Sequence, residues 1–322
     1  MDFLLVFFSS YIGMYIVQTC LHCLIAVLIV ATAAYIWEID MPGIKQVFFY
    51  IPIIFSPMFY IVYQIINPTR GSISFRAHSL FDVNSWLFYK IYNFYPLMIL
   101  FLMLIFISIV LFIFQEILPI IYYKVKCLFA GASSDCYLVI FDFPVLLDIL
   151  KEYPFKEYNI QVVDDIDIIL FSTTGKRDII YISKAVVEQL NNEELKSVIA
   201  HEVAHIGRNK KYILILVYFF RILQFYNPMV LLGFRRIIDI EEMLCDDLAV
   251  SLTDNRKALA DALYKLFIKD SEINNNMTSG ENYKILRRID RLNNNKEQVD
   301  KRYKGKLIFI VITIFVINYF IV

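Results

Sequence analysis

The sequence predicts a mostly α-helical membrane protein with four transmembrane helices and an inserted α+β domain. Of its 322 residues, 59% are hydrophobic, and the mean hydropathy is +0.58. Soluble domains are less apolar than this. The apolar residues gather in long runs within 1–126 and 307–322, whereas 127–306 mixes short apolar segments with charged ones. We therefore expect 127–306 to form a separate domain between the spans.

Net charge gives no support for a nucleic-acid-binding protein, and cysteine content gives none for a disulfide-stabilised one. The 31 basic and 31 acidic residues balance to +0, so no overall positive field favours direct binding of nucleic acid. The five cysteines have no paired spacing in an exported segment and predict no disulfide framework. Cys20, His22 and Cys23 lie inside an apolar run without further ligands nearby, so we expect them to pack against other helices.

Three spans are predicted in the N-terminal region. The first has no basic residue before it and is too long for a cleavable signal peptide, so it is expected to tilt or to extend beyond the bilayer. Pro42 and Gly43 predict a turn after it. Pro52 and Pro57 are expected to kink the second span, which neighbouring helices can tolerate. The predicted spans are 3–36, 47–66 and 96–121.

The predicted fourth span, 307–322, is short. Its sixteen residues cover roughly 24 Å as a helix, and Lys304 and Lys306 can lengthen it by snorkelling. Seven basic residues at 284–302 precede it, so the positive-inside rule places this region, and with it 127–306, in the cytoplasm. This orientation places the loop 67–90 outside, although it carries three positive charges, Arg70, Arg76 and Lys90. The larger number of basic residues near the C-terminus decides the predicted orientation.

Short elements are predicted at the start of the inserted domain. Strands at 137–141 and 160–163 flank a helix at 143–153. Strands at 166–172 and 178–182 surround Thr173-Thr174-Gly175-Lys176, which indicates a hairpin. The apolar segment 212–225 is interrupted by Arg221 and is too short for a span, so we expect a buried or interfacial helix.

The sequence HEVAH at His201–His205 is the strongest chemical signal. Asn192 is a plausible N-cap for a helix here, whose apolar stripe is Leu195, Val198, Ile199 and Ile206. One helical turn separates His201 from His205, so both imidazoles can bind one Zn²⁺, while Glu202 can reach a water on the metal. A chance match in an ordinary amphipathic helix is the alternative.

A third ligand is needed to leave one position open for water. In the segment 239–247, Glu242 and Asp246 share a face if the segment is helical. Glu242 can bind the metal, while Asp246 can accept a hydrogen bond from the second ring nitrogen of His201 and fix its tautomer. The alternative is a solvated acidic face.

These motifs resemble the β-lactam-sensor antirepressor metallopeptidases of staphylococci (BlaR/MecR type), which are membrane-embedded gluzincins. The resemblance is close over 168–249 and loose for the spans. It rests on HEVAHIGR, an apolar helix, Phe225-Tyr226-Asn227-Pro228, Arg235-Arg236 and Asp239-x-x-Glu242-x-x-Cys245-Asp246-Asp247. It implies a gluzincin domain in a bacterial cytoplasmic membrane, His201, His205 and Glu242 as ligands of Zn²⁺, and Glu202 as the catalytic carboxylate.

Three departures limit what the resemblance implies. The family usually has an Asp where this chain has Asn209-Lys210, and a Pro where it has Ser183. The extracellular penicillin-binding sensor domain is also expected to be missing, so β-lactam sensing is not carried over.

The sequence thus predicts a membrane zinc endopeptidase whose substrate is a protein or peptide, such as a cytoplasmic repressor or the chain itself. A quality-control or peptide-maturation protease of the prenyl-protease-like type is an alternative, and a non-catalytic zinc-bearing scaffold or signalling partner is another. A homodimer is left open. The oxyanion-stabilising residue is unassigned, and the candidates for it are Tyr226, Asn227 and Arg235.

Two segments near the C-terminus have alternative interpretations. The polar stretch 271–280 is expected to be a flexible loop, where autocleavage between Ile273 and Asn282 competes with a plain linker. The basic cluster at 284–302 is expected to be an inside-positive anchor, with binding of anionic lipid headgroups as the alternative.

Overall fold

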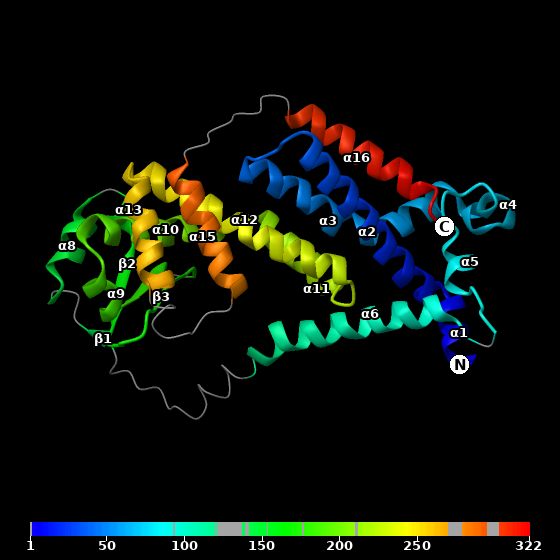
Figure 1. Cartoon of the computed structure of the whole chain (residues 1–322), viewed down its shortest axis with the longest axis horizontal. Coiled ribbons are helices and arrows are strands. Elements are labelled where there is room, and N and C mark those ends of the chain that lie inside the picture. Colours follow the sequence, from blue (N-terminus) through cyan, green and yellow to red (C-terminus); the bar gives the residue numbers. More distant parts are fainter. Residues whose placement is uncertain are drawn as a thin grey trace. The chain divides into compact units, whose positions relative to one another are not determined.

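The computed structural model (Figure 1) describes residues 2–92, 94–119, 121, 137–138, 142–152, 154–175, 177–209, 212–269, 279–294 and 303–322. These residues are mostly helical and include one small sheet. The chain divides into two compact units. Unit 1 comprises Met1–Lys126, Ile215–Ile240 and Gln298–Val322, and unit 2 comprises Cys127–Leu214 and Glu241–Glu297.

Among the described residues of unit 1, three helices are long and apolar enough to cross a membrane. They are Tyr11–Ile36, Pro42–Ile66 and Pro96–Ile117, which correspond to α2, α3, and α6 (Pro96–Phe112) with the π-helix η2 (Ile113–Ile117). The predicted fourth span forms α16 (Tyr303–Tyr319), a helix of 17 residues. Ile310 and Ile314 of α16 are buried and pack with residues of α2 and α3. The count of four spans stays a prediction.

The first predicted span is wrong as one continuous helix, because the chain breaks at Ser10. Residues before it form α1 (Asp2–Ser9), and the Ser10 hydroxyl accepts a hydrogen bond from the N–H of Gly13 at the start of α2. A Cβ at Gly13 would collide with the carbonyl oxygen of Phe7. This glycine therefore lets α1 approach α2 closely.

The predicted turn at Pro42 is also wrong. Pro42 occupies the first turn of α3, where a proline costs no hydrogen bond because the first N–H groups of a helix have no partner within it. The helix thus begins before the predicted start of the second span, and Pro52 and Pro57 lie inside it as expected.

Arg70 in the 67–90 loop is buried in unit 1. Its guanidinium donates to the backbone carbonyl groups of Asn318, Tyr319 and Ile321 at the end of α16. A cation there satisfies carbonyl groups that the helix leaves unpaired. The second charge of this loop, Arg76, pairs with Asp82 at 2.9 Å.

A helical turn between α11 (Tyr212–Leu223) and α12 (Pro228–Thr253) packs into unit 1. The amide nitrogen of Gln224 donates to the Ile53 carbonyl of α3 at 2.8 Å, and its oxygen accepts from Ser56 at 2.8 Å. The segment predicted as a buried or interfacial helix therefore ends among the apolar helices.

The sheet of unit 2 has the strand order β1-β2-β4-β3. Strands β1 (Tyr137–Leu138), β2 (Asn159–Val163), β3 (Leu170–Thr173) and β4 (Ile179–Ser183) lie within a residue or a few residues of the predicted ones. Strand β2 pairs with β4 in parallel, and β3 pairs with β4 as the predicted antiparallel hairpin. Strand β3 lies at the edge of the sheet.

The core of unit 2 lies between the sheet and helix α10 (Asn192–Asn209). Ile180 and Ile182 of β4 are fully buried, as are Leu195 and Ile199 of α10. This core also takes in residues of α13 (Arg256–Leu263) and α15 (Ser279–Asn293). The remaining short elements are η1 (Pro68–Gly71), α4 (Ile73–Arg76), α5 (Val83–Leu87), α8 (Pro144–Lys151), η4 (Phe155–Glu157), α9 (Lys184–Gln189) and η5 (Tyr264–Lys269).

Candidate metal centre

Helix α10 begins with a reciprocal cap. The side chain of Asn191 accepts a hydrogen bond from the Glu194 N–H at 3.0 Å, and the Glu194 carboxylate accepts one from the Asn191 N–H at 2.9 Å. This pattern satisfies two N–H groups at the helix start. Asn191 is therefore the N-cap, and the prediction of Asn192 was wrong by one residue.

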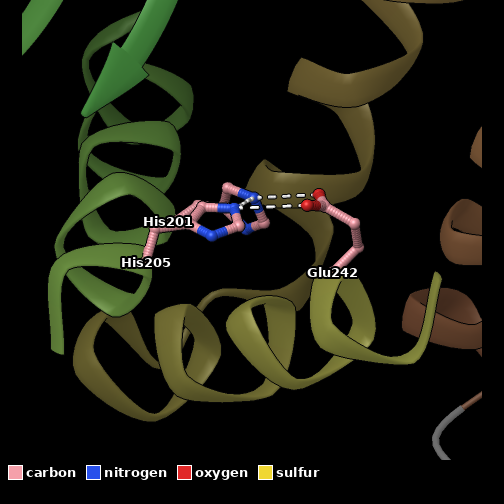
Figure 2. Close-up of side chains that lie close together, drawn as sticks. All are labelled: His201, His205 and Glu242. Carbon is pink, nitrogen blue, oxygen red and sulfur yellow. Dashed lines mark hydrogen bonds and ion pairs between the residues drawn. The ribbon is translucent and has the colours of Figure 1, made fainter. Parts of the chain in front are cut away.

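The two histidines of HEVAH project together from α10 (Figure 2). The Nε2 atoms of His201 and His205 lie 3.1 Å apart, and their rings meet edge to face. His201 is 7% exposed. The structure therefore brings two imidazole nitrogens to one point, as their spacing of one helical turn predicts.

Glu242 of α12 brings its carboxylate close to both imidazoles. One of its carboxylate oxygens lies 3.5 Å from Nε2 of His201, and the other lies 3.5 Å from Nε2 of His205. For tetrahedral zinc with bonds near 2.0–2.1 Å, neighbouring ligand atoms stand about 3.3 Å apart. The distance between the two imidazole nitrogens and the distance from each of them to one carboxylate oxygen are near this separation, with the two carboxylate distances ending on different oxygens. One carboxylate with two imidazoles is a donor set that zinc accepts. These residues can hold a metal ion.

Each histidine has a second partner at its Nδ1 atom. Oδ1 of Asp246 lies 3.1 Å from Nδ1 of His201, and Sγ of Cys245 lies 3.4 Å from Nδ1 of His205. Burial raises the pKa of the Cys245 thiol, and the neighbouring carboxylates raise it further. A partner that accepts the proton of Nδ1 leaves the lone pair of Nε2 directed at the metal position.

Arg288 of α15 joins the carboxylates of the site. Its guanidinium donates to both oxygens of Asp246, at 2.8 and 2.7 Å, and to Oε2 of Glu242 at 2.9 Å. Asp246 is 0% exposed, so its charge requires such partners. Helix α15 is fixed to α12 a second time by Arg291, which pairs with Asp247 at 2.6 Å.

When no metal is bound, these contacts set the protonation of the site. Burial favours the neutral form of Asp246, but the charge of Arg288 and the hydrogen bond from His201 lower the pKa of Asp246 to about 2. Burial likewise lowers the pKa of His201, yet Asp246 and Glu242 outweigh this effect and raise it to about 9. Burial raises the pKa of Glu242, but hydrogen bonds from the two histidines hold it well below its ordinary value.

An ion pair links the two helices that carry the ligands. Arg208, at the end of α10, donates two hydrogen bonds to the carboxylate of Glu241 on α12, one of them at 2.7 Å. Both residues are buried, at 8% and 7% exposed. Because Glu241 and Asp246 are both buried, the alternative of a solvated acidic face for 239–247 is wrong.

A cavity of about 340 Å³ opens beside the candidate ligands. Glu202, which is 6% exposed, lines it next to both histidines, and Arg288 contributes a cation. Three residues of the edge strand β3 line the cavity. Four apolar side chains of α13 and η5 line it as well. The lining residues are Leu170, Phe171, Ser172, Val198, His201, Glu202, His205, Glu242, Leu259, Leu263, Leu266, Phe267 and Arg288.

The candidates predicted for oxyanion stabilisation, Tyr226, Asn227 and Arg235, belong to unit 1, and their role stays a prediction. The side chain of Asn227 accepts from the Met229 N–H at the start of α12. Of the predicted autocleavage segment between Ile273 and Asn282, residues 273–278 lie outside the described residues, and Ser279 begins α15.

Two residues of the site were missed by the sequence reasoning. Cys245 was noted only as part of a motif, and Arg288 was counted within the inside-positive cluster. A signal existed for Arg288, because it falls on the helical stripe that Ile285, Ile289 and Leu292 place against the core. An arginine on a buried stripe calls for an acidic partner.

Comparison with known protein families matches residues 21–292 to the family described as BlaR1 peptidase M56. This range begins within α2 and ends within α15, so it contains every residue of the candidate metal centre. Comparison with curated proteins gives no match.

Proposed function

Because the chain belongs to the BlaR1 peptidase M56 family, we propose that it is a zinc metalloendopeptidase embedded in a bacterial cytoplasmic membrane. The family match confirms the resemblance that the motifs predicted. One observation carries the proposal of a metal-dependent activity. The possible ligand atoms of His201, His205 and Glu242 lie within 4.8 Å of one another, beside Glu202 in one cavity.

His201, His205 and Glu242 are the residues that would hold the metal. Zinc, when bound, supplies a Lewis acid for the peptide carbonyl and lowers the pKa of water in the site. Asp246 and Cys245 hold the two imidazoles in the orientation that exposes Nε2, so the protein fixes the geometry before a substrate arrives.

Glu202 is the general base and acid in this proposal. Its carboxylate takes a proton from the attacking water and delivers it to the leaving amine. Glu202 follows His201 directly on α10 and lines the same cavity, yet it is not one of the three residues whose ligand atoms converge. That placement suits a residue that handles the proton.

The cavity wall favours an extended peptide as the substrate. Strand β3 is the edge strand of its sheet, and Leu170, Phe171 and Ser172 line the cavity. An edge strand can pair with a peptide through main-chain hydrogen bonds, which provide affinity with little sequence selectivity. The leucines of α13 and η5 that also line the cavity favour an apolar side chain near the cleaved bond.

We place the catalytic domain at the cytoplasmic face on the basis of the basic residues that precede α16. The substrate there would be a repressor-type protein or the chain itself, cut as part of regulated proteolysis. Recognition through main-chain bonds also favours a second candidate, a quality-control protease that removes unfolded membrane proteins.

The test uses the full chain purified in detergent, zinc-loaded, with unfolded β-casein as the probe. The wild type is expected to cut β-casein, whereas Glu202→Gln is expected to bind zinc equally and to cut nothing. Equal cleavage by Glu202→Gln would reject the assignment of Glu202, and a fully zinc-loaded wild type that leaves β-casein intact would reject the peptidase activity on unfolded chains.

Comparative proteomics of cells that carry the wild type or Glu202→Gln then separates the two candidate substrates. A single truncated cytoplasmic regulator in the wild-type cells supports regulated proteolysis. Accumulation of many membrane proteins in the Glu202→Gln cells supports quality control instead.

A further inference from the structure

The donors of Arg288 are not all used by its carboxylate partners. Arginine has five N–H groups and accepts no hydrogen bonds. Nε and Nη2 each give one to Asp246, and Nη1 gives one to Glu242. Among the described residues, the two carboxylates thus leave one N–H on each Nη atom unused. Nη2 also lies 3.5 Å from Nε2 of His201, so the guanidinium reaches the atoms proposed to hold the metal.

The position of this arginine is fixed from both sides. Ile285 and Ile289 pack against the core of unit 2 on the same face of α15, and two hydrogen bonds to the fully buried Asp246 hold the plane of the guanidinium. The side chain of Arg288 is 11% exposed. It therefore presents a preorganised positive charge to the cavity.

The proposed function does not yet assign a residue that stabilises the negative charge on the carbonyl oxygen. When water attacks a peptide carbonyl, negative charge develops on the carbonyl oxygen, and donors already aimed at that oxygen lower the barrier. The sequence candidates for this role belong to unit 1, whereas the residues that line the cavity belong to unit 2. Among the described residues that line the cavity, Arg288 is the one with a cationic arginine or lysine side chain.

The hydrogen-bonding capacity of His201 indicates where a free N–H would point. A ring nitrogen that ligates a metal has no lone pair left to accept a hydrogen bond. The N–H of Nη2 that faces Nε2 of His201 then has no acceptor on the imidazole. It faces the reacting centre, where a substrate oxygen can accept it.

We propose that Arg288 is a catalytic residue, which donates a hydrogen bond to the carbonyl oxygen of the scissile peptide and stabilises its negative charge. This inference rests on the proposed function. The water oxygen bonds to the carbonyl carbon, the water proton passes to Glu202, and the π electron pair moves onto the carbonyl oxygen beside Arg288. When this pair re-forms the carbonyl, the C–N bond breaks and Glu202 returns the proton to the amine. Arg288 exchanges no proton.

The experiment compares Arg288→Lys and Arg288→Ala with Arg287→Ala, an exposed neighbour on α15. The full chain is assayed in detergent with a quenched peptide built on the β-casein bond that the wild type cuts fastest. Zinc content and thermal unfolding are measured for each variant. Arg288→Lys keeps a cation beside Asp246, so it preserves the fold where the alanine variant does not.

We expect Arg288→Lys to bind zinc fully and to lose about 100-fold in kcat, with KM little changed, because one oxyanion donor contributes about 10²–10³-fold. Methylguanidinium added to Arg288→Ala is expected to restore part of kcat. Arg287→Ala is expected to match the wild type.

A purely positioning role predicts other results. Zinc affinity would then fall about 10–100-fold, and excess zinc would return the activity of Arg288→Lys to the wild-type value. That restoration, or a kcat that is unchanged at full zinc content, would overturn the proposal. Failure of the proposed function is distinguishable, because in that case the wild type itself has no activity that depends on Glu202.

Discussion

Nδ1 of His201 lies 3.1 Å from Oδ1 of Asp246, while Nε2 of the same ring faces Glu242 at 3.5 Å. Asp246 follows Glu242 by one turn of α12, so a single helix supplies both a possible metal ligand and the carboxylate that orients another. Such a carboxylate fixes which nitrogen of the imidazole carries the proton.

Substitution of this carboxylate tests its role. We expect Asp246→Asn to lower zinc affinity about 10–100-fold, because the neutral amide no longer favours the tautomer with a free Nε2. The affinity is measured by competition with a coloured chelator. Asp247→Asn is the matched control, since Asp247 pairs with Arg291 and does not contact the histidines. Equal losses in the two variants would contradict this role.

Removal of metal should weaken the fold of unit 2. Two of the three proposed ligands lie on α10 and the third on α12, so bound zinc joins helices that are distant in sequence. A ligand at about 1,000 times its Kd stabilises the folded state by about 4 kcal/mol. We expect a chelator to lower the unfolding temperature of the wild type, and zinc to restore it. His205→Ala should show no response to zinc, and a response like that of the wild type would argue against this site.

The ion pair of Arg208 and Glu241 should contribute strongly to stability. Glu241→Gln leaves a buried guanidinium without its charged partner, which costs about 3–5 kcal/mol in the free energy of unfolding. Replacing both residues, as Arg208→Met with Glu241→Leu, should recover most of that loss. Denaturant unfolding in detergent measures each variant.

An exposed ion pair provides the control for this comparison. Glu152→Gln breaks the ion pair between Glu152 and Lys196. The side chain of Glu152 is 55% exposed. Pairs of this kind contribute less than about 1 kcal/mol. A loss of equal size for Glu152→Gln and Glu241→Gln would contradict the role assigned to burial.

The stability of the chelated protein should depend on pH through His201 and Asp246. The folded pKa of His201, about 9, exceeds its ordinary value of 6.5, so its contribution is complete below pH 6.5 and is lost as pH rises through 9. The folded pKa of Asp246, about 2, is below its ordinary 3.8, so that contribution is present above pH 3.8 and is lost as pH falls through 2.

Thermal unfolding in the presence of a chelator, from pH 4 to pH 10, checks the expectation for His201. The wild type should lose stability between pH 6.5 and 9, and His201→Gln should lose less over the same interval. If both proteins fall equally, other groups cause the alkaline loss.

Local spacing explains why much of the site was predictable. The helix that carries HEVAH requires only the apolar stripe of Leu195, Val198 and Ile199 and the turn-by-turn geometry that places His205 above His201. The hairpin of β3 and β4 likewise follows from two short apolar strands around Gly175. The break at Ser10 was missed, because apolar residues continue on both sides of the two serines, Ser9 and Ser10, that interrupt the run.

Sequence alone determined that the chain has apolar helices long enough for a membrane and a pair of histidines one turn apart, because both follow from geometry within a few helical turns. Only the tertiary structure decided that Arg288 reaches Glu242 from 46 positions away, that Cys245 meets His205, and that β3 lies at the sheet edge. Those contacts depend on which whole faces of helices and strands bury one another, and that choice minimises the free energy of the entire domain rather than of any one segment.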